Sequence, residues 1–364
     1  MGNMVQLHDV RVLHITNNLG YGGVQKIIYE LCDTTRHSLS NVCVASSGGV
    51  YVDRLRKIGI QHYQIPDVSS KNPKDIISII RILSRIVREQ NINVIQCHHR
   101  MAVLFAKMLH TDAHIIYVNH TTYSDKGLLT RLILRNVPVV AVGEQAKNNA
   151  ENFFHVPGNR IAVIPNAIAE YDGEFVQVPQ IEEERGKGKF IVTNVGRLHP
   201  QKGMHYFVEA AAKCIDDGLS IAFFIVGDGP LRGELERQVA DLDLADHVHF
   251  MGFREDATNV MYQSDVLAMS SLYEGLPLTP IEACSVGKAV IAPDIEGVRE
   301  VVQNGINGIL YEPKNPDALF SAIKTLYRDR DLLKTYGGQA ELVFRRKFGI
   351  QPFKDAYLKY YEAL

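Results

Sequence analysis

The chain has 364 residues, a length that favours two domains, and its content of 46% hydrophobic and 22% charged residues is typical of a globular protein. The formal net charge of −2 divides into +4 over residues 1–175 and −6 over the remainder, which is too weak a positive charge for a nucleic-acid-binding protein. Five widely spaced cysteines in apolar surroundings predict buried free thiols. Because we find no signal peptide and no apolar run of membrane-spanning length, we expect a cytoplasmic protein.

The first half alternates predicted strands and helices. A glycine-rich loop containing Gly22 and Gly23 follows an apolar strand over residues 10–16 and precedes a helix over residues 24–35. A doubly wound parallel sheet binds its ligand at such a loop. The loop departs from the dinucleotide-binding fingerprint because Gln25 stands where the third glycine belongs. The loop therefore predicts close approach of the backbone to a ligand, with a simple tight turn as the alternative.

Two basic segments of this half have the apolar spacing of amphipathic helices. They are residues 72–90 and residues 126–135. Their arginines and lysines would suit contact with an anionic membrane surface. The alternative is that the apolar positions pack on the protein core while the charges are solvated.

Polar residues follow two further predicted strands. Residues 93–96 lead to His98 and His99, and residues 115–118 lead to His120. The carboxyl ends of the strands form the functional edge of an open α/β sheet. We therefore interpret His120 as a candidate hydrogen-bond donor to a ligand, with a purely structural histidine as the alternative.

A change of composition marks the middle of the chain. Residues 169–189 are charged, contain proline and glycine, and lack a sustained periodicity, so they predict a linker between two domains. The strand predicted at residues 190–195 then leads into a loop with Arg197 and Lys202. These two cations suit the oxygens of a phosphate group. The chain from Leu310 onward is predicted to be helical, with helices over residues 317–329, 331–346 and 352–363.

The alternation of helix and strand continues after this loop. We predict a helix over residues 204–216 and a strand over residues 221–226, which ends at Gly227-Asp228-Gly229-Pro230. Glycines at this position allow a ligand or another loop to approach the backbone closely. A later strand, over residues 247–251, leads to Gly252 and Phe253.

The most informative stretch is residues 270–293, which follows a short apolar strand. A turn with Glu274 leads to a helix that Pro277 opens and Gly287 ends. The N-terminus of this helix is suited to a phosphate. Glu274 and Glu282 are spaced to hold two hydroxyl-bearing parts of one ligand. The alternative is an acidic residue that favours the helix N-terminus, together with a solvated glutamate.

Taken in order, these motifs resemble those of the retaining GT-B glycosyltransferases of family 4, also called the glycogen-synthase-like group or group 1. The matching motifs are Gly22-Gly23, Pro165-Asn166-Ala167, Gly196-Arg197, Lys202-Gly203, Gly227-Asp228-Gly229-Pro230, Glu274-Gly275-Leu276-Pro277, Glu282-Ala283, and Asn304-Gly305 through Asn307-Gly308. The two glutamates form the family's Glu-x7-Glu signature. The resemblance covers nearly the whole chain, and a departure is Gln25, where many members carry glutamate.

The resemblance implies an α/β fold of GT-B architecture, in which two Rossmann-like doubly wound parallel-sheet domains face each other across a cleft. We assign residues 1–172 to the acceptor-side domain and residues 173–349 to the nucleotide-sugar-binding domain. A C-terminal helix at about residues 350–364 is expected to pack back on the first domain.

The resemblance also implies roles for individual residues. Arg197 and Lys202 are expected to bind the diphosphate, and Glu274 is expected to bind the hydroxyls of the donor sugar. His120 matches the family's first-domain histidine near the reacting sugar. The resemblance further implies that Glu282 binds the ribose, that residues 252–253 lie at the nucleobase and that loop amides bind phosphate. The residues implied in these other donor contacts are Gly22, Gly23, Gly252, Phe253, Gly275, Leu278, Thr279 and Glu282.

The implied activity is retaining transfer of a sugar from a nucleotide-sugar, for which we expect UDP, to a glycan or lipid-linked acceptor of cell-surface polysaccharide biosynthesis. We expect no cofactor and no metal, because two cations and a helix N-terminus would stabilise the leaving diphosphate. No Asp-x-Asp metal-binding motif is evident, since Asp329 and Asp331 have that spacing but lie in a predicted turn far from the donor motifs. Peripheral contact with the anionic inner face of a membrane is also expected, and contact with nucleic acid is not.

Two alternatives remain open. A sugar-nucleotide epimerase shares this architecture and needs no acceptor, whereas a non-catalytic partner subunit would keep the fold and only bind nucleotide. The joint presence of Arg197, Lys202, Glu274 and Glu282 argues against the second alternative. Analysis of the products formed without acceptor would separate a transferase from an epimerase.

Overall fold

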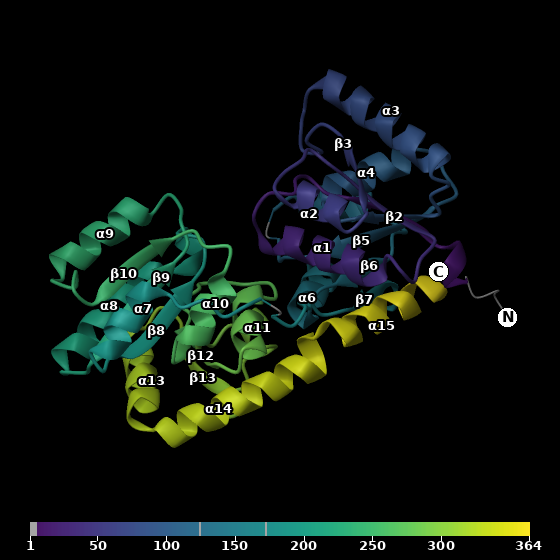
Figure 1. The fold of residues 1–364 in the computed structure, drawn as a ribbon. Helices are drawn as coiled ribbons and strands as arrows, with labels where there is room; N and C mark the ends of the chain where they lie inside the picture. The colour runs from purple at the N-terminus through teal and green to yellow at the C-terminus, as the bar shows by residue number, and fades with distance from the viewer. Residues whose placement is uncertain (1–5, 124, 172) are drawn as a thin grey trace. The chain divides into compact units, whose positions relative to one another are not determined.

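The computed structural model describes residues 6–123, 125–171 and 173–364 (Figure 1). The chain divides into two compact units. The first consists of Met1–Ala169 with Gly349–Leu364, and the second is Glu170–Phe348. The division predicted from the sequence fell after residue 172, which lies outside the described residues. Each unit contains a parallel sheet, so the prediction of two doubly wound α/β domains is confirmed.

The first unit is built on a sheet of seven parallel strands in the order β3-β2-β1-β4-β5-β6-β7. The bounds are β1 Arg11–Ile15, β2 Asn41–Ser46, β3 Gln61–Gln64, β4 Val94–Cys97, β5 His114–Asn119, β6 Val139–Ala141 and β7 Ile161–Val163. β1 pairs with both β2 and β4. The strand order reverses between β1 and β4, and an open parallel sheet binds its ligand at the carboxyl ends of the strands beside such a switch point.

Helices cover both faces of this sheet. They are α1 Gly23–Thr35, α2 Tyr51–Lys57, α3 Pro73–Glu89, α4 Arg100–Met108, α5 Gly127–Ile133, α6 Glu144–Asn152 and α15 Ile350–Glu362, with short 3-10 helices at Leu7–Asp9 and Gly158–Arg160. The basic segment predicted at residues 72–90 is α3, and its Ile79, Leu83 and Ile86 are buried in the core. The apolar stripe of α3 therefore packs on the protein.

The C-terminal helix α15 belongs to the first unit, where it packs against α1 (Figure 1). Phe353, Tyr357 and Tyr361 form its buried face. The hydroxyl of Tyr361 donates a hydrogen bond to Oε1 of Gln96 on β4 at 2.7 Å. The last residues of the chain thus contribute both apolar packing and a buried hydrogen bond to the first sheet.

The second unit is built on six parallel strands in the order β10-β9-β8-β11-β12-β13. The bounds are β8 Phe190–Val195, β9 Ile221–Val226, β10 Val248–Gly252, β11 Val266–Ala268, β12 Ala289–Pro293 and β13 Gly308–Tyr311. The switch point lies between β8 and β11. The prediction of helices from Leu310 onward is wrong for β13, because Leu310 and Tyr311 pair with β12 as an edge strand. A four-residue strand is too short to give a periodic signal.

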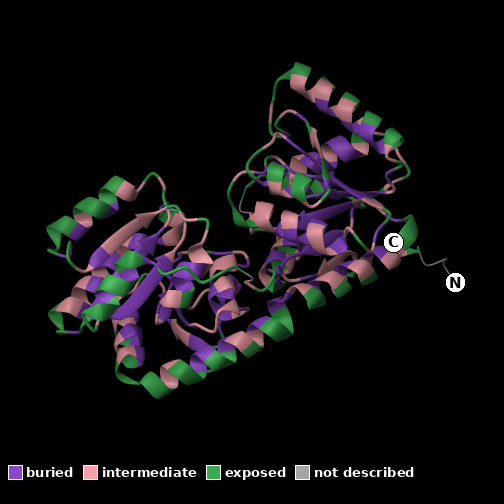
Figure 2. Ribbon diagram, in the orientation of Figure 1, coloured by how far each residue is buried: buried purple, intermediate pink, exposed green. Residues whose placement is uncertain are grey.

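The helices of the second unit also lie on both faces of its sheet. They are α7 Pro179–Gly186, α8 Met204–Asp216, α9 Arg232–Asp241, α10 Ala257–Gln263, α11 Leu278–Ser285, α12 Glu296–Arg299, α13 Pro316–Arg328 and α14 Arg330–Val343, with a 3-10 helix at Pro200–Lys202 and a π-helix at Phe344–Phe348. One core cluster joins α8, α9 and α13 to the sheet, and a second joins α7 and α10 to its other face. Figure 2 shows the strands of both sheets largely buried.

The segment predicted to be a linker between the domains contains helix α7. Ile181 of α7 is buried against the sheet. The carboxylate of Glu184 is also buried. Its two oxygens form ion pairs with Nζ of Lys187 and Nζ of Lys189, each at 2.6 Å. Burial alone would raise the pKa of Glu184, but the hydrogen bonds from the two lysines outweigh burial and lower that pKa below its ordinary value. The high charge of this segment concealed a helix that packs through few apolar residues.

The five cysteines are free and buried, as predicted. Burial raises the pKa of the Cys43 and Cys284 thiols to about 12, so both are protonated and unreactive. Across the part of the chain that the structure describes, no helix has the length and apolar character needed to cross a membrane.

Candidate functional site

The candidate donor site lies at the switch point of the second sheet. The loop after β8 carries Lys202, and the loop after β11 carries Glu274. Their backbones are joined: Oγ of Ser270 donates to the carbonyl of Lys202 at 2.9 Å, and the Leu272 N–H donates to the carbonyl of Gln201 at 2.8 Å. These bonds fix the two loops against each other at the carboxyl ends of neighbouring strands.

Gly203 is required where these loops meet. Its φ is +54°, and a Cβ atom at this position would lie 2.3 Å from the carbonyl oxygen of Ser270. The next loop along the sheet is held in the same way, because Gly227 has a φ of +141° and its Cβ would lie 2.0 Å from the carbonyl oxygen of Gly196. The glycines of the sequence motifs therefore allow three loops to approach one another closely.

The side chains of Lys202 and Glu274 form an ion pair. Nζ of Lys202 lies 2.6 Å from Oε1 of Glu274, and both side chains are largely buried. Gln201 supports the loop by donating from Nε2 to the carbonyl of Tyr273 at 3.0 Å. Arg197 lies on the same loop as Lys202 but is exposed, and it makes no ion pair with another described residue. The structure thus joins two of the predicted residues directly and leaves the Arg197 guanidinium accessible.

Helix α11 begins after Pro277, one residue later than the sequence predicted. Pro277 is the extended N-cap residue, and none of the described side chains caps the helix. Leu278 and Thr279 form the start of the first turn, so their backbone N–H groups are of the kind that binds a phosphate at a helix N-terminus. Glu282 is half-buried on the same helix.

The predicted nucleobase contacts lie further along the sheet edge. Gly252 ends β10, and Phe253 follows it with 50% of its side chain exposed. An exposed aromatic ring at the carboxyl end of a strand is suited to stacking on a planar base. Phe253 and Lys202 follow strands that are not neighbours, because β9 lies between β10 and β8 in the sheet.

A row of three histidines lies at the switch point of the first sheet. Nδ1 of His98 lies 2.9 Å from Nε2 of His120, and Nε2 of His98 lies 3.0 Å from Nδ1 of His14. His14 is fully buried in β1. His98 and His120 were predicted from the sequence, whereas His14 was not, although a polar residue inside an otherwise apolar strand was a signal. His99 is not part of the row, because its Nδ1 accepts from the N–H of Met101 and caps α4.

The three imidazoles are neutral at physiological pH. Burial lowers the pKa of His120 to about 4 and the pKa of His14 to about 3. Burial and the neighbouring His120 and His14 hold the pKa of His98 well below its ordinary value. Each ring nitrogen in the row is therefore a hydrogen-bond donor or acceptor without carrying charge.

The glycine-rich loop of the first unit is closed by Gln25. Its Nε2 donates to Oδ1 of Asn18 at 3.3 Å and to the carbonyl of Asn18 at 3.4 Å. Gly22 is the N-cap residue of α1 and Gly23 begins the helix. The residue that departs from the family pattern thus stabilises the loop that holds the two predicted glycines.

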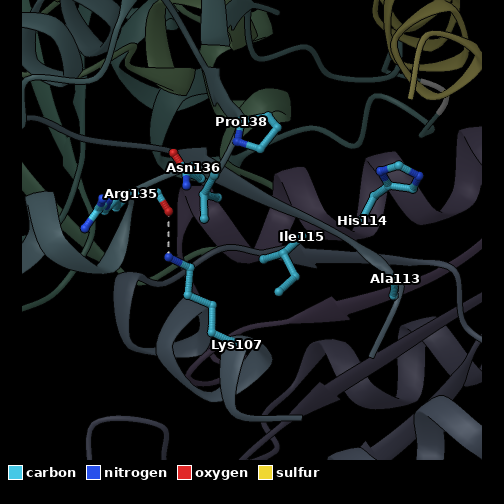
Figure 3. A pocket seen from close by; sticks show the side chains of 8 residues that line it. Lys107, Ala113, His114, Ile115, Arg135, Asn136 and Pro138 are labelled. Carbon is cyan, nitrogen blue, oxygen red and sulfur yellow. Dashed lines mark hydrogen bonds between the residues drawn. The ribbon is translucent and has the colours of Figure 1, made fainter. Parts of the chain in front are cut away.

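A hollow of the first unit lies at the amino ends of the strands of its sheet, opposite their carboxyl ends (Figure 3). It is lined by Lys107, His114, Arg135 and Pro138 among others, at the amino ends of β5 and β6. Nζ of Lys107 donates to the carbonyl of Arg135 at 2.7 Å within it. His98 and His120 lie at the carboxyl ends of the strands, so this hollow is not part of the candidate site.

Two family models match the chain, one for each unit. Residues 21–170 match the model described as Glycosyltransferase Family 4, and residues 179–343 match the model described as Glycosyl transferases group 1. Together the two matches span most of the chain in sequence order.

Relatives and solved structures agree with these models. The chain is 26% identical over 352 residues to the UDP-Gal:alpha-D-GlcNAc-diphosphoundecaprenol alpha-1,3-galactosyltransferase of Escherichia coli, with 89% of each chain covered. It is 29% identical over 219 residues to the N-acetylgalactosamine-N,N'-diacetylbacillosaminyl-diphospho-undecaprenol 4-alpha-N-acetylgalactosaminyltransferase of Campylobacter jejuni, with 59% of this chain and 58% of that one covered.

A solved structure with the same fold is that of Anabaena Alr3699/HepE in complex with UDP and glucose. The TM-score is 0.84 at 19% sequence identity, and the match covers 98% of this chain and 100% of that one. Because both units match glycosyltransferase models in order, and because the chain shares its fold with this solved structure over nearly its whole length, this chain is a GT-B glycosyltransferase of the family 4 type.

Proposed function

We propose that this glycosyltransferase transfers a sugar from a UDP-sugar to a glycan or lipid-linked acceptor, with retention of configuration, in the biosynthesis of a cell-surface polysaccharide. The observation that carries the proposal is the Lys202–Glu274 pair at the switch point of the second sheet, next in sequence to the uncapped start of α11. A uridine donor is supported by the UDP-Gal in the name of the Escherichia coli protein and by the UDP in the complex of the Anabaena protein. A lipid-linked acceptor is supported by the diphosphoundecaprenol names of the two bacterial relatives.

The leaving diphosphate is stabilised by this chain's own positive groups. Cleavage of the sugar–phosphate bond places negative charge on the diphosphate, and preorganised donors aimed at developing charge give large rate gains. Arg197 offers an exposed guanidinium, Lys202 offers an ammonium group, and α11 offers its first-turn N–H groups. We propose that these groups suffice without a metal.

The donor's configuration is retained when the acceptor attacks the anomeric carbon on the same face from which the leaving diphosphate departs. The acceptor oxygen forms a bond to the anomeric carbon as the bond from that carbon to the diphosphate oxygen breaks. The proton of the acceptor hydroxyl passes to the leaving diphosphate oxygen, so no protein base is consumed. This route asks the protein only to position both substrates and to stabilise the diphosphate.

The carboxylates of Glu274 and Glu282 are assigned to two different parts of the donor. Glu274 accepts hydrogen bonds from hydroxyls of the transferred sugar in this proposal, and its ion pair with Lys202, the residue assigned to the diphosphate, supports that role. Glu282, half-buried on α11, accepts hydrogen bonds from the ribose. Phe253 stacks on the uracil ring. Glu274 and Phe253 follow the carboxyl ends of β11 and β10, and Glu282 lies on the helix that follows β11.

A donor panel tests the proposal. Thermal shift measurements with UDP-, GDP- and ADP-sugars identify the base, and nuclear magnetic resonance of the product reports the anomeric configuration. We expect a UDP-sugar to stabilise the protein and the product to retain the donor's configuration. Formation of a new sugar epimer without acceptor would instead identify an epimerase. Excess chelator should leave transfer intact, and activity restored only by Mg²⁺ or Mn²⁺ would contradict the metal-free mechanism.

We also propose that α5 contacts the inner face of a membrane that carries the acceptor. Leu128, Leu129 and Leu132 are 74%, 51% and 60% exposed, which is unusual for leucines on one short helix. Lys126 and Arg131 lie among them and are exposed. Exposed apolar side chains beside basic ones suit insertion among anionic headgroups, with about 1 kcal/mol per basic residue. The helix α3 is less suited, since its apolar stripe is buried.

A further inference from the structure

The row of His14, His98 and His120 joins three adjacent strands. His14 lies within β1, and His98 and His120 directly follow β4 and β5. The backbone fixes the first link of the row, because the N–H of His98 donates to the carbonyl of Ile15 at 2.8 Å. The ring-to-ring distances of 3.0 Å and 2.9 Å are ordinary hydrogen-bond lengths. The row is thus a feature of the strand order and not of a mobile loop.

Two hydrogen bonds between neutral imidazoles force all three rings into one consistent arrangement. A neutral imidazole has one N–H and one nitrogen with a free lone pair. If His14 donates from Nδ1, then His98 accepts at Nε2 and must donate from Nδ1, and His120 accepts at Nε2. His120 then carries its proton on Nδ1. In the opposite arrangement every proton lies on Nε2, and Nδ1 of His120 is an acceptor.

The two ends of the row decide between these arrangements. Nε2 of His14 and Nδ1 of His120 are both buried and have no hydrogen-bond partner among the described residues. One end must hold an N–H and the other a lone pair. A buried N–H without a partner is rarer in proteins than an unpaired acceptor. His14 is fully inside the unit. His120 is partly exposed at the carboxyl edge, so its end of the row is the one that lies beside a ligand-binding surface, although Nδ1 itself is covered in this structure. The lone pair therefore belongs at His14 and the N–H at His120.

We propose that His14 and His98 are positioning residues that fix His120 as the neutral Nδ1–H tautomer, which donates a hydrogen bond to an oxygen of a ligand bound at the carboxyl edge of the first sheet. The tautomer assignment stands on the geometry of the first unit alone. That the ligand is a substrate of sugar transfer rests on the proposed function. The device gives His120 a donor that does not depend on protonation from solvent, because the neutral ring already carries the proton on the required nitrogen.

Nuclear magnetic resonance of the full-length ligand-free protein tests the tautomers directly. The ¹⁵N shifts of a neutral imidazole separate its protonated nitrogen from its unprotonated one, and the form favoured in water is Nε2–H. We expect His14, His98 and His120 to be Nδ1–H together at neutral pH. Detection of Nε2–H at His120 would overturn the proposal whether or not the protein transfers a sugar.

Variants of His98 test the coupling. His98→Leu removes the link, so His120 should lose its single tautomer, and kcat should fall about tenfold, the factor expected when one transition-state hydrogen bond is weakened. His98→Gln provides an amide oxygen for His14 and an N–H for His120, so it should keep the Nδ1–H signal of His120 and most of kcat. If His98→Leu does not fold, His14→Leu breaks the row at its buried end and is expected to act in the same direction.

The matched control is His62→Gln on β3. Nε2 of His62 bonds Oγ of Ser46 at 2.9 Å and takes no part in the row, so this variant should change neither the tautomers nor kcat. An unchanged Nδ1–H signal at His120 in both His98→Leu and His14→Leu would overturn the positioning role. Absence of sugar transfer by the wild-type protein would count against the proposed function alone, since the ¹⁵N measurement needs no substrate.

Discussion

At the scale of single residues, the cations assigned to the leaving diphosphate carry the sharpest prediction. Arg197→Ala and Lys202→Ala should each lower turnover by roughly 100-fold, because each removes a positive group from the developing charge. Steady-state transfer measured with a saturating donor checks this. The control is Lys213→Ala, since Lys213 pairs with Asp317 on the surface of the same unit at 2.8 Å and should be silent. Activity equal to wild type in both site variants would refute the assignment.

The ion pair between Lys202 and Glu274 separates two kinds of ligand. Glu274→Gln removes the negative charge that lies 2.6 Å from Lys202, so free UDP should bind at least as tightly as it does to the wild type. The UDP-sugar should bind more weakly, because the carboxylate assigned to the sugar hydroxyls is lost. Glu282→Gln should weaken both ligands alike, as expected for a ribose contact. Calorimetric titration of the two ligands into both variants measures the difference, and equal losses throughout would contradict the division of roles.

Most residues of the candidate site could be named from the sequence, but His14 and the contacts between these residues could not. Lys202 and Glu274 are 72 positions apart, and they meet because β11 lies next to β8 in the sheet. His14 escaped notice for the same reason, since its link to His98 depends on β4 lying next to β1. Sequence patterns locate the carboxyl ends of strands, whereas the strand order decides which ends are neighbours.

At the scale of elements, agreement follows the strength of the periodic signal. The helix predicted over residues 204–216 and the strand over residues 221–226 are confirmed with the same bounds, because each has a long and regular apolar pattern. Helix α7 was missed since it packs mainly through Ile181 and holds a buried Glu184. Strand β13 was missed because pairing with β12, not local sequence, determines its conformation.

The two basic helices of the first unit give a paired test of membrane contact. Exchange of Leu128, Leu129 and Leu132 for serine on α5 should abolish co-sedimentation with vesicles that contain anionic lipid, because these side chains are exposed and free to insert. Exchange of Arg81, Arg85 and Arg88 for glutamine on α3 should only weaken it, since the apolar stripe of α3 is buried. Both effects should be measured at low and at physiological salt.

Vesicles of neutral lipid serve as the reference in this experiment. Binding of the wild type should fall as the salt concentration rises, because the basic residues contribute through screened charge. Equal binding of wild type and the α5 variant would place the contact elsewhere, and no binding of wild type in either salt would remove the membrane from the proposed function.

At the scale of the whole molecule, each unit brings its candidate residues to the same topological position. Lys202 and Glu274 follow β8 and β11, the strands that flank the switch point of the second sheet. In the first sheet the corresponding strands are β1, which contains His14, and β4, which His98 directly follows. The two units therefore use one structural rule for different chemistry: charged groups in the second and neutral hydrogen-bond donors in the first.

The chain forms the first unit from two segments that are distant in sequence, and this makes its C-terminal helix a test of how the units are stabilised. Removal of residues 349–364 takes away Phe353, Tyr357 and Tyr361, which are buried, and also the hydrogen bond from Tyr361 to Gln96. Loss of large buried aromatic side chains costs several kcal/mol each, so the first sheet should unfold or exchange rapidly. The second sheet lies wholly within Glu170–Phe348 and should keep its protection.

Hydrogen exchange followed by mass spectrometry measures both units in the same sample. In the truncated protein, peptides that contain β1 and β4 should lose protection while those that contain β8 and β9 retain it, and thermal unfolding should separate into two transitions. The milder variant Tyr361→Phe keeps the aromatic packing and removes only the 2.7 Å hydrogen bond to Oε1 of Gln96, so it should lower the stability of the first unit by about 1 kcal/mol. Full protection of the first sheet after truncation would mean that residues 1–169 fold without the C-terminal helix, and that α15 is only an addition to a complete domain.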